Sequence, residues 1–179
     1  DKLLDDWMCR FLGVNASSED ERQYITAVSR LMLIQAVARA KKPGFKADSV
    51  VVLEGEQGTG KSTALRLLFS DKHFGDQLPH MASKDASSYL KGKWCVELAE
   101  LDFKRKTEVE TIKAFISRLT ENYRPAFGRE EIEVDRTCVF IGTTNSDNYL
   151  SDETGNRRFL PIKTTSIDIG NLGGHRDRL

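Results

Sequence analysis

The apolar residues of the first 48 positions recur every three or four residues, which is the spacing of one face of a helix. A first stripe consists of Trp7, Met8, Phe11 and Leu12. A second stripe carries Tyr24, Ile25, Val28, Leu31, Met32, Ile34, Gln35 and Val37. Ser18 and Glu21 have the spacing of a capping box at the start of this longer helix, and Lys42-Pro43-Gly44 would end it. Residues 1–48 therefore predict a helical lead-in that packs on the remaining chain.

From residue 49 the pattern changes to short apolar runs separated by helical segments. Strands are expected at 49–54, 93–99, 138–142 and 159–162. The last of these should lie at a sheet edge, because Pro161 cannot donate a ladder hydrogen bond. Helices are expected at 61–69 and 84–90. This alternation predicts an α/β fold with a parallel central sheet flanked by helices.

Two later segments have their own signatures. Thr107 and Glu110 have the spacing of a capping box that opens another helix. Its apolar face would hold Ile112, Phe115, Ile116 and Leu119. Pro125 and Gly128 are turn formers, and the alternating residues 131–134 follow them. Together they predict a hairpin within residues 123–136.

The loop between the first strand and its helix, Gly55-Glu56-Gln57-Gly58-Thr59-Gly60-Lys61-Ser62, fits the pattern G-x-x-x-x-G-K-[ST]. Its glycines let backbone N–H groups turn toward a phosphate, and the helix N-terminus adds partial positive charge. Lys61 would reach the β- and γ-phosphates, and the Ser62 hydroxyl would ligate Mg²⁺. We therefore predict that this loop, with Thr63 after it, binds ATP and Mg²⁺. The alternative is a glycine-rich turn without a ligand.

The overall composition restricts the partners of this chain. The 179 residues include 27 Lys and Arg and 27 Asp and Glu, so the formal charge is zero and nucleic-acid binding would need local basic patches. Cys95 and Cys138 lie in apolar runs and are predicted to be buried free thiols, which suits a reducing cytoplasm. Because there is no apolar run near 18 residues and no signal-like N-terminus, membrane insertion is not predicted.

Hydrolysis requires an acid near Mg²⁺ and the attacking water. Glu97 and Glu100 accompany the second strand, and sites on parallel sheets form outside the carboxyl ends of strands. Glu100 is therefore expected to be a catalytic acid and a metal ligand. Glu97, earlier in the strand, would be a costly unpaired carboxylate and should reach a metal, a water or a base. Asp102 is a weaker third candidate.

Two further groups complete this predicted site. Thr143-Thr144-Asn145 follows the third core strand, where the Asn145 amide would orient water and sense the γ-phosphate. A helix cap or turn is the alternative for these residues. Arg157 and Arg158 lie on a later loop and are candidates for a transition-state cation, acting in cis or on a neighbouring subunit. A salt bridge to Asp152 or Glu153 is the alternative for this pair.

The order of these segments, from the phosphate loop through Gly92–Leu101, Tyr123–Arg129 and Arg136–Asn145 to Gly155–Phe159, resembles the virulence-associated E family. This phage- and mobile-element-linked group is similar to superfamily III helicases within the AAA+ class. The resemblance covers roughly residues 1–178. It departs from the usual adjacent Asp-Glu pair of Walker B, because the chain has Glu-x-x-Glu instead.

The resemblance implies a P-loop NTPase fold of AAA+ type and a motor that hydrolyses ATP during DNA replication. Lys61 and Ser62 match Walker A, Glu97 and Glu100 the Walker B region, and Asn145 sensor 1. Arg157 or Arg158 matches the arginine finger, with Arg157 the more mobile candidate.

The resemblance also bears on partners. It implies a homo-hexameric ring whose hairpin grips single-stranded DNA in the pore, so Tyr123, Arg124 and Arg129 are predicted DNA contacts. Phe127, like Tyr123, would either stack on bases or pack internally. Lys104-Arg105-Lys106 is a further basic point.

Two other functions remain open from the sequence. A small-molecule kinase would use the same phosphate loop, with an acceptor pocket in the 70–92 segment. A nucleotide-gated regulator would bind a partner other than DNA. The sequence divides into a lead-in at 1–48, an ATPase core at 49–165 and a tail at 166–179. Since it starts without methionine and ends in a polar stretch, we expect a piece of a longer protein.

Overall fold

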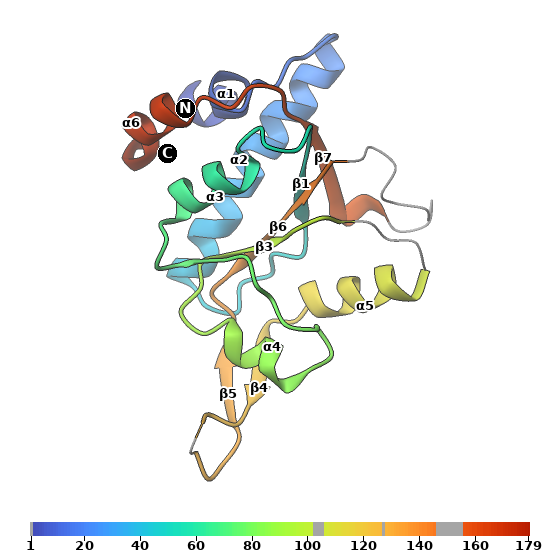
Figure 1. Ribbon diagram of the computed structural model, residues 1–179, viewed down its shortest axis with the longest axis vertical. Coiled ribbons are helices and arrows are strands. Elements are labelled where there is room, and N and C mark those ends of the chain that lie inside the picture. The colour runs from blue at the N-terminus through green and yellow to red at the C-terminus, as the bar shows by residue number, and fades with distance from the viewer. Residues whose placement is uncertain (1, 102–105, 127, 146–155) are drawn as a thin grey trace.

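The computed structural model describes residues 2–101, 106–126, 128–145 and 156–179 of the chain (Figure 1). The helices are α1 (Lys2–Phe11), α2 (Glu19–Lys41), α3 (Lys61–Phe69), α4 (Lys84–Tyr89), α5 (Lys106–Ile116) and α6 (Ile169–His175), with 3₁₀ turns η1 (Asn156–Arg158) and η2 (Arg176–Arg178). The strands are β1 (Val50–Glu54), β2 (Phe74–Gly75), β3 (Cys95–Leu98), β4 (Thr120–Tyr123), β5 (Ile132–Asp135), β6 (Val139–Thr144) and β7 (Phe159–Lys163).

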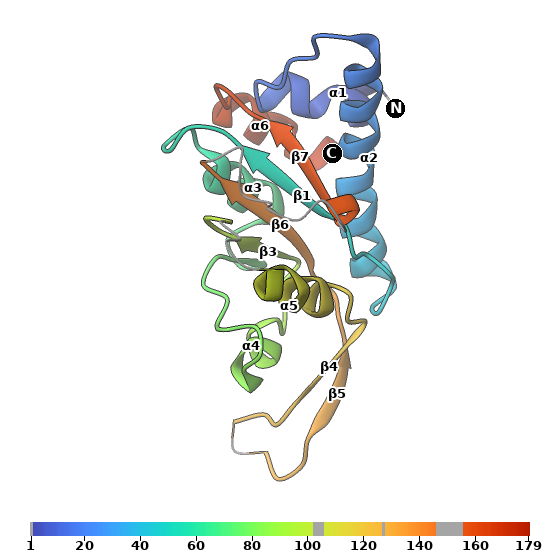
Figure 2. The same cartoon turned by 90° about the vertical axis from the view of Figure 1, so that its right-hand side faces the viewer.

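Five of these strands form one parallel sheet in the order β2-β3-β6-β1-β7. β7 lies at an edge of the sheet and pairs only with β1. The missing N–H of Pro161 therefore costs no hydrogen bond to a strand on the other side. The prediction of a parallel central sheet flanked by helices is confirmed. β4 and β5 form a separate antiparallel hairpin that extends from one end of the molecule (Figure 2).

Alternate residues of the central strands face two different cores. Val51 and Leu53 of β1 pack with α1, α2, α3 and α6, whereas Val50 and Val52 pack with α4 and α5. β6 divides in the same way, with Ile141 on the first face and Phe140 on the second. This two-sided burial explains why the strands read as continuous apolar runs.

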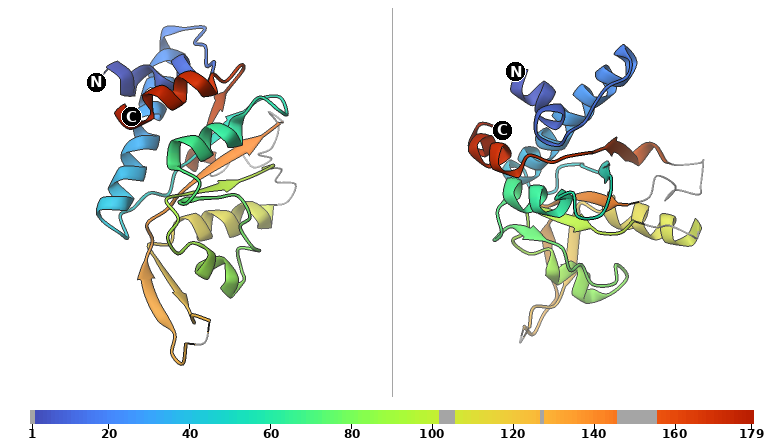
Figure 3. Two further views of the ribbon diagram at one scale, coloured as in Figure 1. Left: turned by 60° about the vertical axis from the view of Figure 1, so that its left-hand side comes forward. Right: turned by 45° about the horizontal axis from the view of Figure 1, so that its top comes forward.

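The two terminal segments complete the first core together. Asp168 donates its backbone N–H to the Phe11 carbonyl (2.9 Å), and α6 lies beside α1 (Figure 3). Leu172 of α6 is fully buried. The sequence analysis treated residues 166–179 as a tail and missed α6, because its glycines have low helix propensity. Packing of Leu172 on α3 and α1 stabilises this helix instead.

Several local predictions can be compared with the structure. Ser18 caps α2 by accepting the Glu21 N–H (3.2 Å), whereas the Glu21 carboxylate accepts from Ser17. α5 begins at Lys106, so Thr107 lies inside its first turn and is not the predicted cap. Leu119 is 43% exposed and lies beyond α5, so it does not belong to the buried face.

The predicted apolar stripe of α2 was also partly wrong. Tyr24, Ile34 and Val37 are exposed, and the buried face carries Ser29 and Arg39 in their place. β2 was missed because two residues have no periodicity, and only pairing with β3 makes them a strand. Cys95 and Cys138 are buried free thiols, as predicted, and burial raises the pKa of the Cys138 thiol to about 11.

Candidate functional site: the phosphate loop and the hairpin

The phosphate loop joins the carboxyl end of β1 to the N-terminus of α3. Gly58 and Gly60 have φ angles of 82° and 93°, which side chains rarely adopt. A Cβ at Gly58 would meet nothing within 4 Å, so the loop faces open space there. A cavity of about 320 Å³ opens above it. Its lining consists of Gln57, Gly58, Thr59, Gly60, Lys61, Ser62, Thr63, Ala99, Glu100, Thr143, Thr144 and Asn145.

Lys61 is the buried cation of this cavity, with 7% of its surface exposed. Its ammonium donates to the carbonyls of Gly55 (2.7 Å) and Glu56 (2.8 Å) and to Oδ1 of Asn145 (3.2 Å). Burial lowers the pKa of Lys61, and the charge of Glu97 opposes that shift. The predicted loop residues and Asn145 are therefore brought together around one positive charge.

Glu97 contacts the serine of the phosphate loop. Its Oε1 accepts hydrogen bonds from Ser62 Oγ and Thr143 Oγ1, both at 2.6 Å, and the residue is only 2% exposed. The sequence predicts Glu100 as the metal ligand because Glu97 falls earlier in the strand. β3 ends at Leu98, and Glu97 lies beside the N-terminus of α3, so Glu97 joins Glu100 as a candidate ligand. The bond from Thr143 was also missed, since it joins two strands far apart in the sequence.

Glu100 lies at the edge of the same cavity in an unusual backbone conformation. Its φ is 53°, in the left-handed region. The next residue, Leu101, is fixed to β6 through its N–H to the Thr143 carbonyl (3.1 Å) and its carbonyl to Thr144 Oγ1 (3.1 Å). The exposed Glu100 side chain thus comes from a tightly held segment. Asp102, the third candidate acid, lies outside the described residues.

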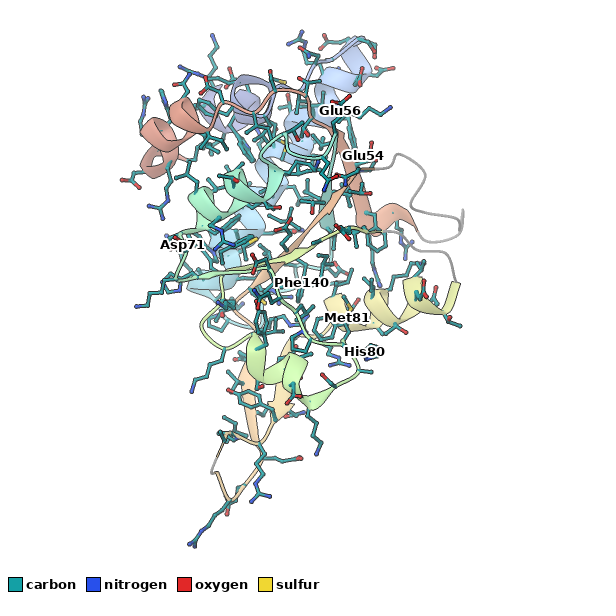
Figure 4. All side chains as sticks on the ribbon, in the orientation of Figure 1. Glu54, Glu56, Asp71, His80, Met81 and Phe140 are labelled. Atoms are coloured by element: carbon teal, nitrogen blue, oxygen red, sulfur yellow. The ribbon has the colours of Figure 1, made fainter. Side chains whose placement is uncertain are left out.

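A second, larger cavity adjoins the first. It measures about 650 Å³ and shares Ala99 and Glu100 with the phosphate-loop cavity, and Glu97 also lines it. Its other walls are residues 76–82 and α5, with His80 and Met81 visible in Figure 4. The two cavities therefore meet where the acidic side chains lie.

The two arginines lie at the opposite end of the sheet from the phosphate loop. In the parallel pairing of β1 with β7, Phe159 is opposite Val50. Arg157 and Arg158 therefore lie beside the start of β1, and the loop follows its end, about 15 Å further along. Neither arginine extends that far within its own chain.

The two arginines differ in their environment. Arg158 forms an ion pair with Asp48 (3.6 Å) and donates to the Lys113 carbonyl (3.3 Å). Arg157 is exposed. Asp152 and Glu153, the alternative partners of this pair, lie outside the described residues.

A hairpin is present, but its first strand β4 begins at Thr120, before the predicted range 123–136, and one of the three predicted DNA contacts is buried. Tyr123 is only 4% exposed, so its ring is a packing group here and is not available for stacking. Arg124 and Arg129 are exposed, and Arg124 Nε donates to the Gly128 carbonyl (2.6 Å) across the turn. Phe127 and the pair Lys104-Arg105 lie outside the described residues. The exposed acids of the hairpin are Glu130, Glu131, Glu133 and Asp135.

A buried ion pair attaches the hairpin to the rest of the fold. Arg136 Nη2 bonds Glu121 Oε1, and Arg136 Nη1 donates to the Phe115 carbonyl (2.8 Å). Glu121 Oε2 accepts from Ser87 Oγ of α4 (2.6 Å). The Arg136 guanidinium also stacks on Phe140, with its carbon 5.0 Å from the ring centroid. The sequence analysis missed this network because its members are far apart along the chain.

Comparison with known proteins places the chain in a family. The model of the virulence-associated protein E-like domain matches residues 1–179. The chain therefore belongs to this family, and the resemblance noted in the sequence is confirmed. A search of curated proteins found no match.

Two solved structures share the fold. Two apo structures of the NrS-1 C terminal region are 18% and 17% identical, with TM-scores of 0.59 and 0.61; each alignment covers 99% of this chain and 43% of that one. The X-ray structure of JCV helicase is 14% identical, with a TM-score of 0.46, over 96% of this chain and 51% of that one. The chain thus spans less than half of the NrS-1 chains. Among the described helices, none is long and apolar enough to cross a membrane.

Proposed function

We propose that this chain is the ATP-hydrolysing motor domain of a phage or mobile-element DNA replication protein, working as a helicase similar to superfamily III. The observation that carries the proposal is the hydrogen-bonded group around the phosphate loop. Lys61 and Asn145 meet on one side of the loop, and Ser62 and Glu97 meet on the other. Membership of the virulence-associated protein E-like family supports the replication context.

The residues around the phosphate loop fit a nucleoside triphosphate with Mg²⁺. Gly58 and Gly60 keep the loop open, and the backbone N–H groups at the start of α3 favour an anion. Lys61 would exchange its bonds to Gly55 and Glu56 for phosphate oxygens. Ser62 and Glu97 would hold Mg²⁺, directly or through water. When bound, this ion would neutralise charge on the phosphates.

Glu100 and Asn145 are suited to act on the attacking water. Both line the phosphate-loop cavity, and both are exposed to solvent. Glu100 would accept the proton of the water, and Asn145 would orient the water and report the γ-phosphate to β6. Glu97, whose Oε1 already accepts from two hydroxyls, is less suited to take that proton.

The arginine position supports an assembly in which sites are shared. Because Arg157 lies at the opposite end of the strands from its own phosphate loop, it would serve the nucleotide of a neighbouring subunit. We propose a homo-oligomeric ring, hexameric as in superfamily III helicases. Arg158, held by Asp48, would fix the segment that carries Arg157.

DNA-stimulated ATP hydrolysis by the full-length protein tests this proposal. We expect hydrolysis to rise when single-stranded DNA is added and to fall about 10²- to 10³-fold in Lys61→Ala. The motor proposal would be contradicted if the rate of ATP hydrolysis depended neither on added DNA nor on whether the protein is a monomer or an oligomer in solution.

The second cavity keeps one alternative function open. Its volume of about 650 Å³ beside Glu97 and Glu100 would accommodate a phosphate acceptor, as a small-molecule kinase requires. Phosphoryl transfer from ATP to added metabolites, followed by ³¹P NMR, distinguishes the two. Release of inorganic phosphate alone favours the motor.

A further inference from the structure

The loop that follows α2 carries three exposed lysines and one exposed aromatic ring. Lys41, Lys42 and Lys46 are all exposed, and residues 39–46 contain no acid. Phe45, between these lysines, is 39% exposed. The carboxylate of Asp135 from β5 lies against Gly44 of this loop, and the three lysines leave the surface cationic beside it. It lies at the foot of α2, beside the root of the hairpin (Figure 2).

A buried arginine under this loop, Arg39, fixes its conformation. Arg39 is completely buried, and its guanidinium donates to the carbonyls of Cys138 (3.2 Å) and Ala47 (3.4 Å). The fully buried cation therefore joins the end of α2 to the far side of the loop and to the residue just before β6. Its role in this fold is mechanical, because it holds the two ends of the loop together.

Two backbone bonds set the shape of the turn itself. Phe45 N–H donates to the Lys42 carbonyl (3.0 Å), and Gly44 N–H donates to the Arg136 carbonyl (3.0 Å). Gly44 has a φ of 76°, which glycine tolerates without strain. The aromatic ring is thus presented on a rigid turn, so little conformational entropy would be lost when a ligand orders it.

The combination of lysines and an exposed ring fits single-stranded nucleic acid. Lysines would contact the phosphates, and an aromatic face stacks on an unpaired base without reading its identity. The neighbouring hairpin is less suited to a polyanion, because four exposed acids accompany its two arginines. A strand bound near the hairpin would be attracted to the lysine loop and repelled by β5.

We propose that residues 41–46 form a binding site for single-stranded DNA, in which Phe45 stacks on a base and Lys41, Lys42 and Lys46 contact phosphates. The site lies at the amino ends of the sheet strands, away from the phosphate loop. The proposal deepens the proposed function, since it names where the DNA would bind, and it rests on that function for its biological purpose.

A second copy of the chain could bind the same surface instead of DNA, and the experiment must distinguish the two. Ile34 (57% exposed) and Val37 (40% exposed) precede Lys41 on α2 and extend the apolar surface. A protein partner would use all these apolar groups, whereas DNA would use Phe45 and the lysines. The variant Ile34→Asn therefore separates the two.

The experiment measures binding of fluorescently labelled oligo(dT) to the full-length protein by anisotropy, without ATP and over a range of salt concentrations. Replacing Lys41, Lys42 and Lys46 with Gln should raise Kd roughly tenfold or more and reduce the salt slope by about 2. A charge-matched control replaces the exposed Lys2, Lys72 and Arg178 with Gln and should leave both nearly unchanged.

The aromatic variants test stacking separately. Phe45→Ala should raise Kd about fivefold to 100-fold, Phe45→Leu nearly as much, and Phe45→Trp should bind normally with its fluorescence quenched by the oligonucleotide. Circular dichroism checks that each variant is folded. Equal loss of affinity in the control triple, or no loss in the loop variants, would overturn the proposal.

Solution mass completes the test. If Phe45→Ala and Ile34→Asn both dissociate an assembly while affinity per subunit is retained, the face is a subunit interface and the DNA site is wrong. Failure of the ATPase proposal would instead appear as unchanged oligo(dT) binding with no hydrolysis in wild type. The two proposals therefore fail by different measurements.

Discussion

The two ends of the parallel sheet use polar residues in opposite ways. At the carboxyl ends, Lys61 bonds to Asn145 and Ser62 bonds to Glu97 around one small cavity. At the amino ends, the charged groups that face solvent are spread over a loop, a 3₁₀ turn and a hairpin. The polar groups buried there, Arg39 and Arg136, bond to backbone carbonyls, and Arg136 also pairs with the Glu121 carboxylate.

This difference indicates a division of work within one domain. The carboxyl end holds its side chains in place before a ligand arrives, which is what phosphate chemistry requires. The amino end anchors flexible cations on buried arginines, which is suited to a long polymer or to a second subunit. The predictions below separate these two ends, beginning with the largest expected effect.

Arg157→Ala should reduce ATP hydrolysis about 10³- to 10⁵-fold while leaving nucleotide affinity intact, as for loss of a finger acting between subunits. Mixing this variant with Lys61→Ala subunits should restore part of the activity, because some interfaces then pair an intact loop with an intact arginine. Absence of rescue in rings shown to be mixed would contradict a role in trans.

Arg136→Met should destabilise the fold by about 3–5 kcal/mol, because Glu121 would be left buried without its partner. Urea unfolding followed by circular dichroism measures this change. The double variant Arg136→Met/Glu121→Met removes both charges and should lose less than the single one. A larger loss of stability in the double variant would show that the ion pair itself stabilises the base of the hairpin.

Lys61→Ala should lower hydrolysis by about 10²- to 10³-fold and weaken nucleotide binding, because the cavity loses its buried cation. A phosphate-release assay and a fluorescent ATP analogue report the two effects. Lys72→Ala, at an exposed position after α3, is the matched control. Comparable hydrolysis by both variants would contradict the phosphate-loop assignment.

Glu100→Gln should keep ATP and Mg²⁺ binding and slow hydrolysis by roughly 10²-fold, as for loss of a general base. Glu97→Gln should instead raise the Mg²⁺ concentration needed for half-maximal binding, since its carboxylate faces Ser62. Glu130→Gln, on the hairpin, should change neither quantity. If Glu97→Gln slows turnover at saturating Mg²⁺ more than Glu100→Gln does, the two roles are reversed.

Replacing Arg124 and Arg129 with Ala should have the smallest effect. The salt slope of oligo(dT) binding should fall by about 1.4 if both contact phosphates, and nucleotide affinity should persist. Measured beside the lysine-loop variants, this double variant ranks the hairpin against residues 41–46. A steeper loss from the hairpin would place the main DNA contact there.

Much of the fold followed from the sequence because its signals are local. Continuous apolar runs at 50–53 and 138–142 predicted buried parallel strands, and the glycines with Lys61 and Ser62 predicted the phosphate loop. The hairpin followed from Pro125 and Gly128. α6 and β2 did not follow, because a glycine-rich helix and a two-residue strand depend on neighbours distant in the chain.

The sequence by itself determined which residues carry the candidate chemistry, since a phosphate loop is one continuous segment whose backbone makes the site. Only the tertiary structure decided how distant residues combine. The length of β3 placed Glu97 on Ser62, and the pairing of β1 with β7 separated Arg157 from its own loop. Packing likewise buried Tyr123 and left Phe45 exposed. These outcomes depend on strand register and burial, which no local pattern of residues encodes.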